Sequence, residues 1–302
     1  MALHEHTTHG QAGGSRWRLV GVVLALLAAW LLLRVAFFEG FWGVDDLHHV
    51  RFALAMDHPP ANHWETRLPP NALLWASFQV LGFSEAAAAV PSLIGSLLFV
   101  LSGVAMSWHL WRCPKMTAWV GLLLAVLPGD VLFSTTPGAR IFATGIFCLA
   151  VTLLMTRRGW ASLIVSGLLL GLAVWSHLFV MFYVGIVLLC VAWMKLRSWR
   201  QAAVGLGIAV AAFAAPSIAI DAIWTGDPLH SFHVAQKSHL AGVAIDVHAR
   251  HIRTDNGGVD WMFFVRPVKD LLFSKEANLL GLAAVVGGVA VWRGRLARVW
   301  AW

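Results

Sequence analysis

Two adjacent carboxylates and two adjacent imidazoles stand together in the first polar segment that follows a hydrophobic helix. They belong to Asp45, Asp46, His48 and His49. A partly desolvated carboxylate can act as a general base, because burial and nearby charges adjust its pKa. Neighbouring residues point in different directions on a regular helix or strand, so we expect the two aspartates to serve different roles. One is a candidate base, and the other is a candidate helix cap or cation ligand.

Imidazoles beside carboxylates also suit a metal ion. The candidate ligands are Asp45, His48 and His49, and a divalent cation is the one cofactor that the sequence suggests. The segment has no diagnostic spacing such as HExxH, so solvated or hydrogen-bonded histidines are the competing interpretation. For the aspartates, the competing interpretation is an N-cap before a helical pattern at residues 47–56.

Four basic residues near the ends of apolar runs are candidates for substrate binding: Arg67, Arg140, His177 and Lys237. A guanidinium at the edge of a membrane can hold a phosphate through paired, charge-assisted hydrogen bonds. The alternative is that such side chains extend to lipid headgroups. Asp130 would be costly in contact with lipid, so we expect it to face the protein interior.

These polar residues are embedded in a very apolar chain. Of 302 residues, 59% are hydrophobic and 12% are charged, with a mean hydropathy of +0.73, whereas a soluble domain carries about 25% charged residues. We therefore expect an integral, all-α polytopic membrane protein. The net charge of +7 comes from short basic clusters between apolar runs. That spacing is typical of cytoplasmic loops, so we expect no nucleic-acid partner.

The apolar runs predict eight membrane spans, with both termini in the cytoplasm. The first run, Leu19 to Phe38, is long enough to cross a hydrocarbon core of about 30 Å. The other spans are expected at 86–110, 117–133, 140–156, 160–175, 178–194, 201–220 and 278–292. Residues 1–15 are predicted to be a disordered cytoplasmic leader, and residues 16–302 a single transmembrane domain.

Two polar segments, 39–85 and 221–277, are predicted to lie on the outer side of the membrane. This topology treats residues 69–82, which begin with Pro-Pro, as a juxtamembrane helix in the interface. It places four basic clusters in the cytoplasm, as the positive-inside rule requires. These are Arg112/Lys115, Arg157/Arg158, Lys195/Arg197/Arg200 and Arg293/Arg295/Arg298. We expect the acidic cluster and the histidine-rich second segment to pack together over a cavity.

A series of short motifs follows in order along residues 20–235. The pair Asp45-Asp46 is followed by Arg67-Leu68-Pro69-Pro70 and then by Gly82-Phe83-Ser84-Glu85. Later motifs are Val90–Gly95, Leu127–Asp130, Ala139–Phe142, Gly167–His177 and Thr225–Leu229. In this order the chain resembles the GT-C superfamily of glycosyltransferases that use polyprenyl-phosphate sugars, particularly the bacterial relatives of protein O-mannosyltransferases and lipid A aminoarabinose transferase.

The resemblance implies a GT-C-like helical bundle in the inner (plasma) membrane, with its catalytic face outward in the periplasm. The implied reaction moves a sugar from a polyprenyl phosphate to an acceptor hydroxyl with inversion, and Asp45 or Asp46 is the implied general base. Because phosphate is a good leaving group, one base and electrostatic stabilisation suffice. Arg140 is the implied phosphate contact, with Arg67 and His177 as further candidates. The expected partners are the donor lipid, membrane lipids and a membrane protein complex.

Two other classes of function stay open. Leu68 interrupts the basic-Pro-Pro motif, and Ile141-Phe142 stand where the family has Pro-Tyr. These departures favour a non-catalytic GT-C-like subunit that stabilises or assembles a larger membrane complex. A transporter or lipid flippase is less favoured, because transporters bury ionisable residues near the middle of their spans. Here such residues gather at the predicted outer edge.

Overall fold

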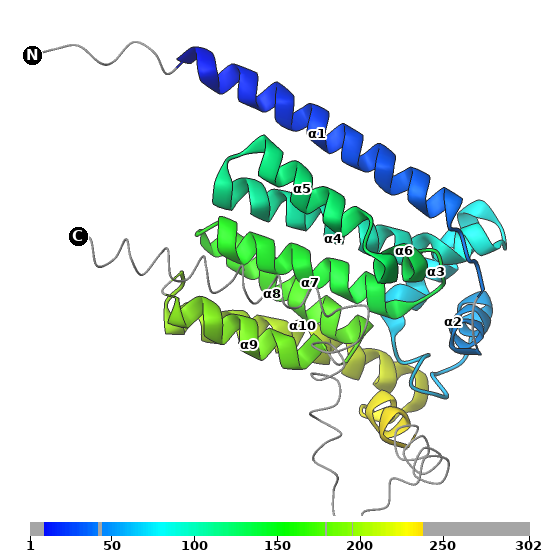
Figure 1. Ribbon diagram of the computed structural model, residues 1–302. Helices are drawn as coiled ribbons and strands as arrows, with labels where there is room; N and C mark the ends of the chain where they lie inside the picture. Colours follow the sequence, from blue (N-terminus) through cyan, green and yellow to red (C-terminus); the bar gives the residue numbers. More distant parts are fainter. Residues whose placement is uncertain (1–8, 42–43, 179, 195, 238–302) are drawn as a thin grey trace, which may run out of the picture. The chain divides into compact units, whose positions relative to one another are not determined.

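The computed structural model describes residues 9–41, 44–178, 180–194 and 196–237. Every regular element with defined bounds in these ranges is an α-helix (Figure 1). All of these residues belong to one compact unit, Met1–His239. The helices are α1 (His9–Ala36), α2 (Val44–Ala55), α3 (Leu68–Leu81), α4 (Glu85–Trp111), α5 (Pro114–Ala125), α6 (Pro128–Ser134), α7 (Ala139–Thr156), α8 (Trp160–Ser176), α9 (Val180–Trp193) and α10 (Trp199–Thr225).

Four of the described helices are long and apolar enough to cross a membrane: α1 over Trp17–Ala36, α4, α7 and α10. Helices α5 and α6 form a fifth candidate span if they are taken together, with a bend of 55° at a short break. Helices α8 and α9 are apolar but shorter. The prediction of an all-helical, multi-pass membrane protein is therefore confirmed, with four or five candidate spans in the described residues. The predicted span at 278–292 lies outside them.

The break between α5 and α6 has a local cause in the sequence. Pro128 has no backbone N–H and disfavours a helical conformation in the residue before it, so α5 ends and a new helix begins at the proline. The freed carbonyl of Ala125 accepts a hydrogen bond of 2.5 Å from the Arg34 guanidinium of α1. An arginine from another helix therefore supplies the hydrogen bond that this carbonyl at the end of α5 lacks within its own helix.

The same guanidinium forms a buried ion pair with Asp130 in the first turn of α6. Ser96 of α4 donates to the Asp130 carboxylate at 2.6 Å, and the Trp30 indole donates to Ser96 at 2.9 Å. Asp130 is only 4% exposed, so the prediction that it faces the interior is confirmed. These bonds join α1, α4 and α6 and compensate the cost of burying both charges.

Helices α4 and α7 approach so closely that glycine is required where they cross. A Cβ atom at Gly95 would overlap the backbone of Ile141, and one at Gly145 would overlap the backbone of Gly95. Close backbone contact of this kind is how transmembrane helices gain van der Waals packing without a hydrophobic driving force between them. Helix α7 then packs against α8, and α8 packs against α10.

Helix α3 is too short to be one of the candidate membrane spans and packs against the start of α4. It begins with Leu68-Pro69-Pro70, where proline suits the first turn because its missing N–H has no helical partner there. Its buried side chains Leu74 and Phe78 pack with residues of α2 and the start of α4. The predicted separate helix at 69–82 is confirmed, and its position in the membrane interface stays a prediction.

Two boundaries differ from those expected. Helix α1 begins at His9, so residues 9–15 of the predicted leader are helical, while residues 1–8 lie outside the described residues. Helix α10 continues to Thr225, so Asp221 belongs to it and not to the second polar segment. Gly226 ends α10 with a φ of 74°, which glycine adopts without strain. Residues 230–237 are helical, and residues 238–277 are not described.

Candidate functional site

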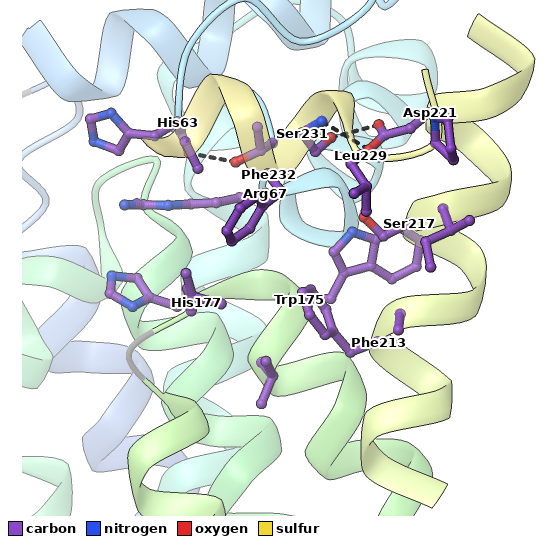
Figure 2. Close-up of a pocket in the computed structure, with 17 residues that line it drawn as sticks. His63, Arg67, Trp175, His177, Phe213, Ser217, Asp221, Leu229, Ser231 and Phe232 are labelled. Atoms are coloured by element: carbon purple, nitrogen blue, oxygen red, sulfur yellow. Dashed lines mark hydrogen bonds between the residues drawn. The ribbon is translucent and has the colours of Figure 1, made fainter. Parts of the chain in front are cut away.

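A cavity of about 220 Å³ lies where four segments of the chain meet (Figure 2). These segments are the residues before α3, the C-terminal end of α8, the second half of α10 and the turn and short helix that follow α10. They supply His63, Arg67, Trp175, His177, Phe213, Ser217, Asp221, Leu229, Ser231 and Phe232. Most of the lining is apolar, and the ionisable side chains other than Asp221 gather at one side of the cavity (Figure 2).

Asp221 attaches the short helix 230–237 to α10. Its carboxylate, 2% exposed, accepts hydrogen bonds from the Ser231 backbone N–H at 2.8 Å and from the Ser231 hydroxyl at 2.7 Å. A carboxylate at the first turn of a helix satisfies N–H groups that have no partner within the helix. Asp221 is therefore a positioning residue for one wall of the cavity.

The two polar segments are in direct contact. The Nε2 atom of His230 lies 2.9 Å from the carbonyl oxygen of Pro60, and both segments line the cavity. The loop that follows α2 therefore contacts the histidine-rich segment through Pro60 and His230. The packing of the acidic cluster itself against that segment stays a prediction.

A buried hydrogen-bond network fixes the loop between α2 and α3. The Nδ1 atom of His49 lies 2.7 Å from Oδ1 of Asn71, whose side-chain nitrogen donates to the carbonyls of Trp64 and Glu65. Because the Asn71 nitrogen is engaged with two acceptors, Oδ1 must be the acceptor from His49. His49 therefore donates from Nδ1 to Asn71.

His48 contacts Trp64, and not Asn71 as His49 does. Its ring stacks on Trp64 with centroids 4.7 Å apart and planes at 8°, and the His63 ring contacts the same indole at 3.6 Å. Glu65 stabilises this turn by accepting from the backbone N–H of Ala61 and the side chain of Asn62, both at 2.6 Å. The loop that carries Arg67 to the cavity is thus supported by side-chain contacts along its length.

Positive charge is concentrated around His177, which follows the last turn of α8. Burial, and then the charges of Arg67 and Arg140, lower the pKa of His177 to about 3. The imidazole is therefore neutral near pH 7 and lies within the electrostatic reach of both guanidinium groups. His63, Arg67 and His177 lie above one another along one side of the cavity (Figure 2).

This arrangement brings together three of the four residues predicted to bind substrate. Arg67 and His177 line the cavity, and Arg140, exposed on the first turn of α7, acts on His177 from nearby. Lys237, the fourth, is exposed and does not line the cavity. Two guanidiniums beside the neutral imidazole of His177 can bind an anion such as a phosphate, because each guanidinium offers charge-assisted hydrogen bonds.

The aspartate pair lies within α2 and not before it. Helix α2 begins at Val44, so Asp45 and Asp46 occupy its first turn, where the helix dipole stabilises negative charge. The N-cap interpretation, which required a helix starting near residue 47, does not fit this boundary. Asp46 is half-buried, and the side chain of Asp45 lies outside the described part of the structure. The role of either carboxylate as a base stays a prediction.

The predicted metal ligands Asp45, His48 and His49 are only partly described. Among the described residues, no group of three or more His, Cys, Asp or Glu side chains is arranged to hold a metal ion. His48 stacks on Trp64, whereas His49 uses Nδ1 to bond Asn71. Two adjacent imidazoles with separate partners do not favour joint coordination of one ion, so no catalytic step is assigned to a metal here.

Sequence reasoning missed the residues that shape the apolar part of the cavity, among them Trp175, Ser217 and Asp221. A signal for Asp221 was present, because a carboxylate four residues from the end of a long apolar helix is costly unless it has a partner. Ser217 precedes Asp221 by four residues and therefore lies on the same helix face. Trp175 carried no comparable signal, since its role depends on how α8 packs against α10.

No family model, no curated protein and no solved structure matches this chain.

Proposed function

We propose that the protein is a membrane glycosyltransferase that moves a sugar from a polyprenyl-phosphate donor to an acceptor hydroxyl on the outer face of the inner (plasma) membrane. The observation that carries this proposal is the cavity with a cationic side and an apolar remainder, set among apolar helices. A ligand that matches both parts has an anionic head and an apolar body. A lipid phosphate has this chemistry, and the order of the sequence motifs supports the same donor.

The reaction is a single displacement at the sugar carbon that is bonded to the donor phosphate. The acceptor oxygen forms a bond to that carbon while its proton passes to a carboxylate, and the bond from carbon to phosphate oxygen breaks with its electron pair on the phosphate. Asp45 or Asp46 is the proposed base. Arg67 and Arg140 stabilise the charge that grows on the departing phosphate, which is the largest single contribution in many enzymes.

We further propose eight membrane spans with both termini in the cytoplasm, which places residues 39–85 and 221–277 outside. The ends of the described helices support this alternation. Arg67, just before α3, lines the cavity together with residues near the C-terminal ends of α8 and α10, and Arg140 at the start of α7 acts on His177 at the end of α8. In a separate region, Arg197 donates to the carbonyls of Arg158 and Gly159, at 2.6 and 3.3 Å, so two basic loops predicted to be cytoplasmic are in contact.

A transfer assay with a radiolabelled polyprenyl-phosphate sugar tests the proposal, using wild type, Asp45→Asn and Asp46→Asn. Asparagine keeps the size of the side chain and removes its charge. One of the two variants should lose turnover by about 10²–10⁴-fold, which is typical for a general base, while donor binding is retained. The other should change stability more than turnover.

An active wild type whose two asparagine variants both turn over normally would show that neither aspartate is the base. A wild type that binds no lipid-phosphate sugar would instead favour the non-catalytic subunit.

A further inference from the structure

A buried hydrogen bond between side chains joins α2, which carries the candidate bases, to α3. The Nδ1 atom of His49 lies 2.7 Å from Oδ1 of Asn71. His49 is 4% exposed and Asn71 is 1% exposed. Breaking the His49–Asn71 bond would leave buried polar groups without a partner, which costs free energy, so the folded protein keeps the two helices joined at this point.

On the α3 side, the His49–Asn71 bond continues to Arg67, the proposed phosphate contact. The side-chain nitrogen of Asn71 donates to the carbonyls of Trp64 and Glu65, at 3.1 and 3.3 Å. The backbone N–H of the same asparagine donates to the carbonyl of Arg67 at 3.4 Å. Asn71 therefore holds the backbone from which the Arg67 side chain reaches the cavity.

On the α2 side, the His49–Asn71 bond lies next to the two candidate bases. Asp45 and Asp46 precede His49 by four and three residues, so these positions share one side of the helix. Asp46 is half-buried, whereas Leu47 and Arg51, on the opposite side of α2, are exposed. The apolar contacts between α2 and α3 are non-directional, so a bond between defined atoms is needed to fix how α2 is placed.

His49 also lies near the cationic side of the cavity. Burial, and then the charges of Arg67 and Arg140, lower the pKa of His177, and His49 acts in the same direction. Asp46 does not line the cavity. The residue one turn after it is nevertheless within electrostatic reach of the proposed phosphate site, so the His49–Asn71 bond lies between the first turn of α2 and that site.

We propose that His49 and Asn71 are positioning residues, whose hydrogen bond holds the base on α2 at a fixed distance from Arg67. This inference rests on the proposed function and adds to it how the base and the phosphate contact keep one geometry. In a single displacement, the attacking oxygen and the departing phosphate lie on opposite sides of the sugar carbon. A misplacement of about 1 Å can therefore lower the rate about 10²-fold.

Two amide side chains at position 49 test the role of the bond. In His49→Asn the amide nitrogen takes the place of Nδ1, whereas in His49→Gln it takes the place of Nε2 and does not reproduce the bond. His49→Gln should lower the transfer rate at saturating donor by about 10²-fold, and His49→Asn should keep most of the wild-type rate. The donor concentration at half-maximal rate should be unchanged in both variants, because Asn71 still holds the loop that carries Arg67.

Asn71→Leu keeps the size of the side chain and removes its hydrogen bonds to both sides. It should lower the rate and also raise the donor concentration at half-maximal rate by about tenfold, because the charge-assisted hydrogen bond from Arg67 is weakened. His58→Gln is the matched control. The Nδ1 atom of His58 lies 3.0 Å from Oδ1 of Asp57, but both side chains are exposed and the bond joins neighbours in sequence. This variant should keep the wild-type rate.

The rates are measured on the full-length chain in lipid nanodiscs. The donors are radiolabelled mannose, glucose and aminoarabinose forms of undecaprenyl phosphate, and native membrane extract supplies the acceptor. Amide hydrogen exchange gives a second measurement that needs no substrate. Exchange at residues 46–50 should be faster in His49→Gln than in His49→Asn, because local opening of a helix is easier when a buried contact is lost.

Equal transfer rates in the two amide variants, or equal exchange at residues 46–50, would overturn the positioning role and leave the proposed function intact. A purely structural role would change thermal stability and leave the rate per folded molecule the same in both variants. If wild type binds none of the three donors, the proposed function itself is wrong, and hydrogen exchange still decides whether the His49–Asn71 bond holds α2.

Discussion

At the scale of single residues, the cavity is organised around a histidine that stays neutral. His177 is 8% exposed and lies near two arginines, so both burial and charge oppose its protonation. A neutral imidazole can accept or donate a hydrogen bond without adding a further positive charge to the site. The arginines are then the main source of attraction for an anion.

The low pKa of His177 predicts that acid destabilises the protein. Its pKa falls from an ordinary value of 6.5 to about 3 in the folded chain. Between these values the unfolded state binds a proton that the folded state does not, so stability is lost as the pH falls below about 6.5. Replacing His177 with Gln should remove this contribution. The loss of unfolding free energy between pH 7.5 and 5 should be smaller by about 2 kcal/mol.

Thermal unfolding in nanodiscs across this pH range measures the effect. His109, on the last turn of α4, supplies a control substitution outside the cavity. Equal pH dependence of wild type and His177→Gln would contradict the assignment of a neutral His177.

Arg67, Arg140 and His177 could be chosen from the sequence as candidate binding residues because each lies at the end of an apolar run, where a basic side chain is informative. Their convergence was not predictable. They lie on a loop, on the first turn of α7 and after the last turn of α8, and only the packing of α7 and α8 brings them together. Trp175 is one of seventeen tryptophans in the chain, and no local pattern distinguishes its indole from the others.

At the scale of helices, the network around Arg34 decides where α1 sits. Helix α1 contacts α5 and α6, and Arg34 bonds the end of the first and the start of the second. Removing one partner of a buried ion pair leaves the other charge without compensation, which costs about 3–5 kcal/mol. Replacing both partners with apolar residues of similar size removes that cost.

Asp130→Leu should therefore destabilise the protein by about 3–5 kcal/mol, and Arg34→Met should do the same. The double variant should recover most of this loss, because neither charge remains buried. Thermal unfolding of the four proteins in one lipid composition gives the coupling free energy. Additive single losses, with no recovery in the double variant, would show that the two side chains do not stabilise each other.

Helix boundaries were predictable where the sequence carries a strong signal. Proline at 69–70 begins α3, and Ser176-His177 separates α8 from α9 within one long apolar run. The start of α2 at Val44 was placed too late, because a pair of aspartates suits both an N-cap before a helix and the first turn of a helix. The sequence does not distinguish these two positions. The end of α10 was placed too early because Asp221 resembles a residue of a polar loop until its bond to Ser231 is known.

At the scale of the whole molecule, membrane orientation follows from which helix ends carry the basic clusters. Ser84 caps α4 at the end near α3, and Arg158 lies between α7 and α8 at the end contacted by Arg197. Single cysteines at these two positions, in a background without Cys113, Cys148 and Cys190, test the orientation. A membrane-impermeant thiol reagent added from outside should label the cysteine at Ser84 and not the one at Arg158. Labelling at Arg158 would contradict the proposed topology.

The class of the protein was predictable from composition alone, because no soluble core could bury so many apolar residues. Its function was predictable only as a resemblance carried by short motifs, since a catalytic site depends on convergence in space. The described residues show that the cationic side chains lie together at one side of the cavity. Asp46 does not line the cavity, and the Asp45 side chain lies outside the described residues, so the approach of the proposed base to the donor stays a prediction.

The central claim is that the cationic side of the cavity binds a lipid phosphate, and one binding measurement tests it directly. Arg140 and Arg200 form a matched pair, because each is an exposed arginine at the second position of an apolar helix, α7 and α10. Affinity for undecaprenyl phosphate is measured in nanodiscs for wild type, Arg140→Ala and Arg200→Ala. A charge-assisted hydrogen bond contributes about 1.5–3 kcal/mol, so Arg140→Ala should weaken binding by about 10- to 150-fold and Arg200→Ala should not. Equal affinity in all three proteins would contradict the claim.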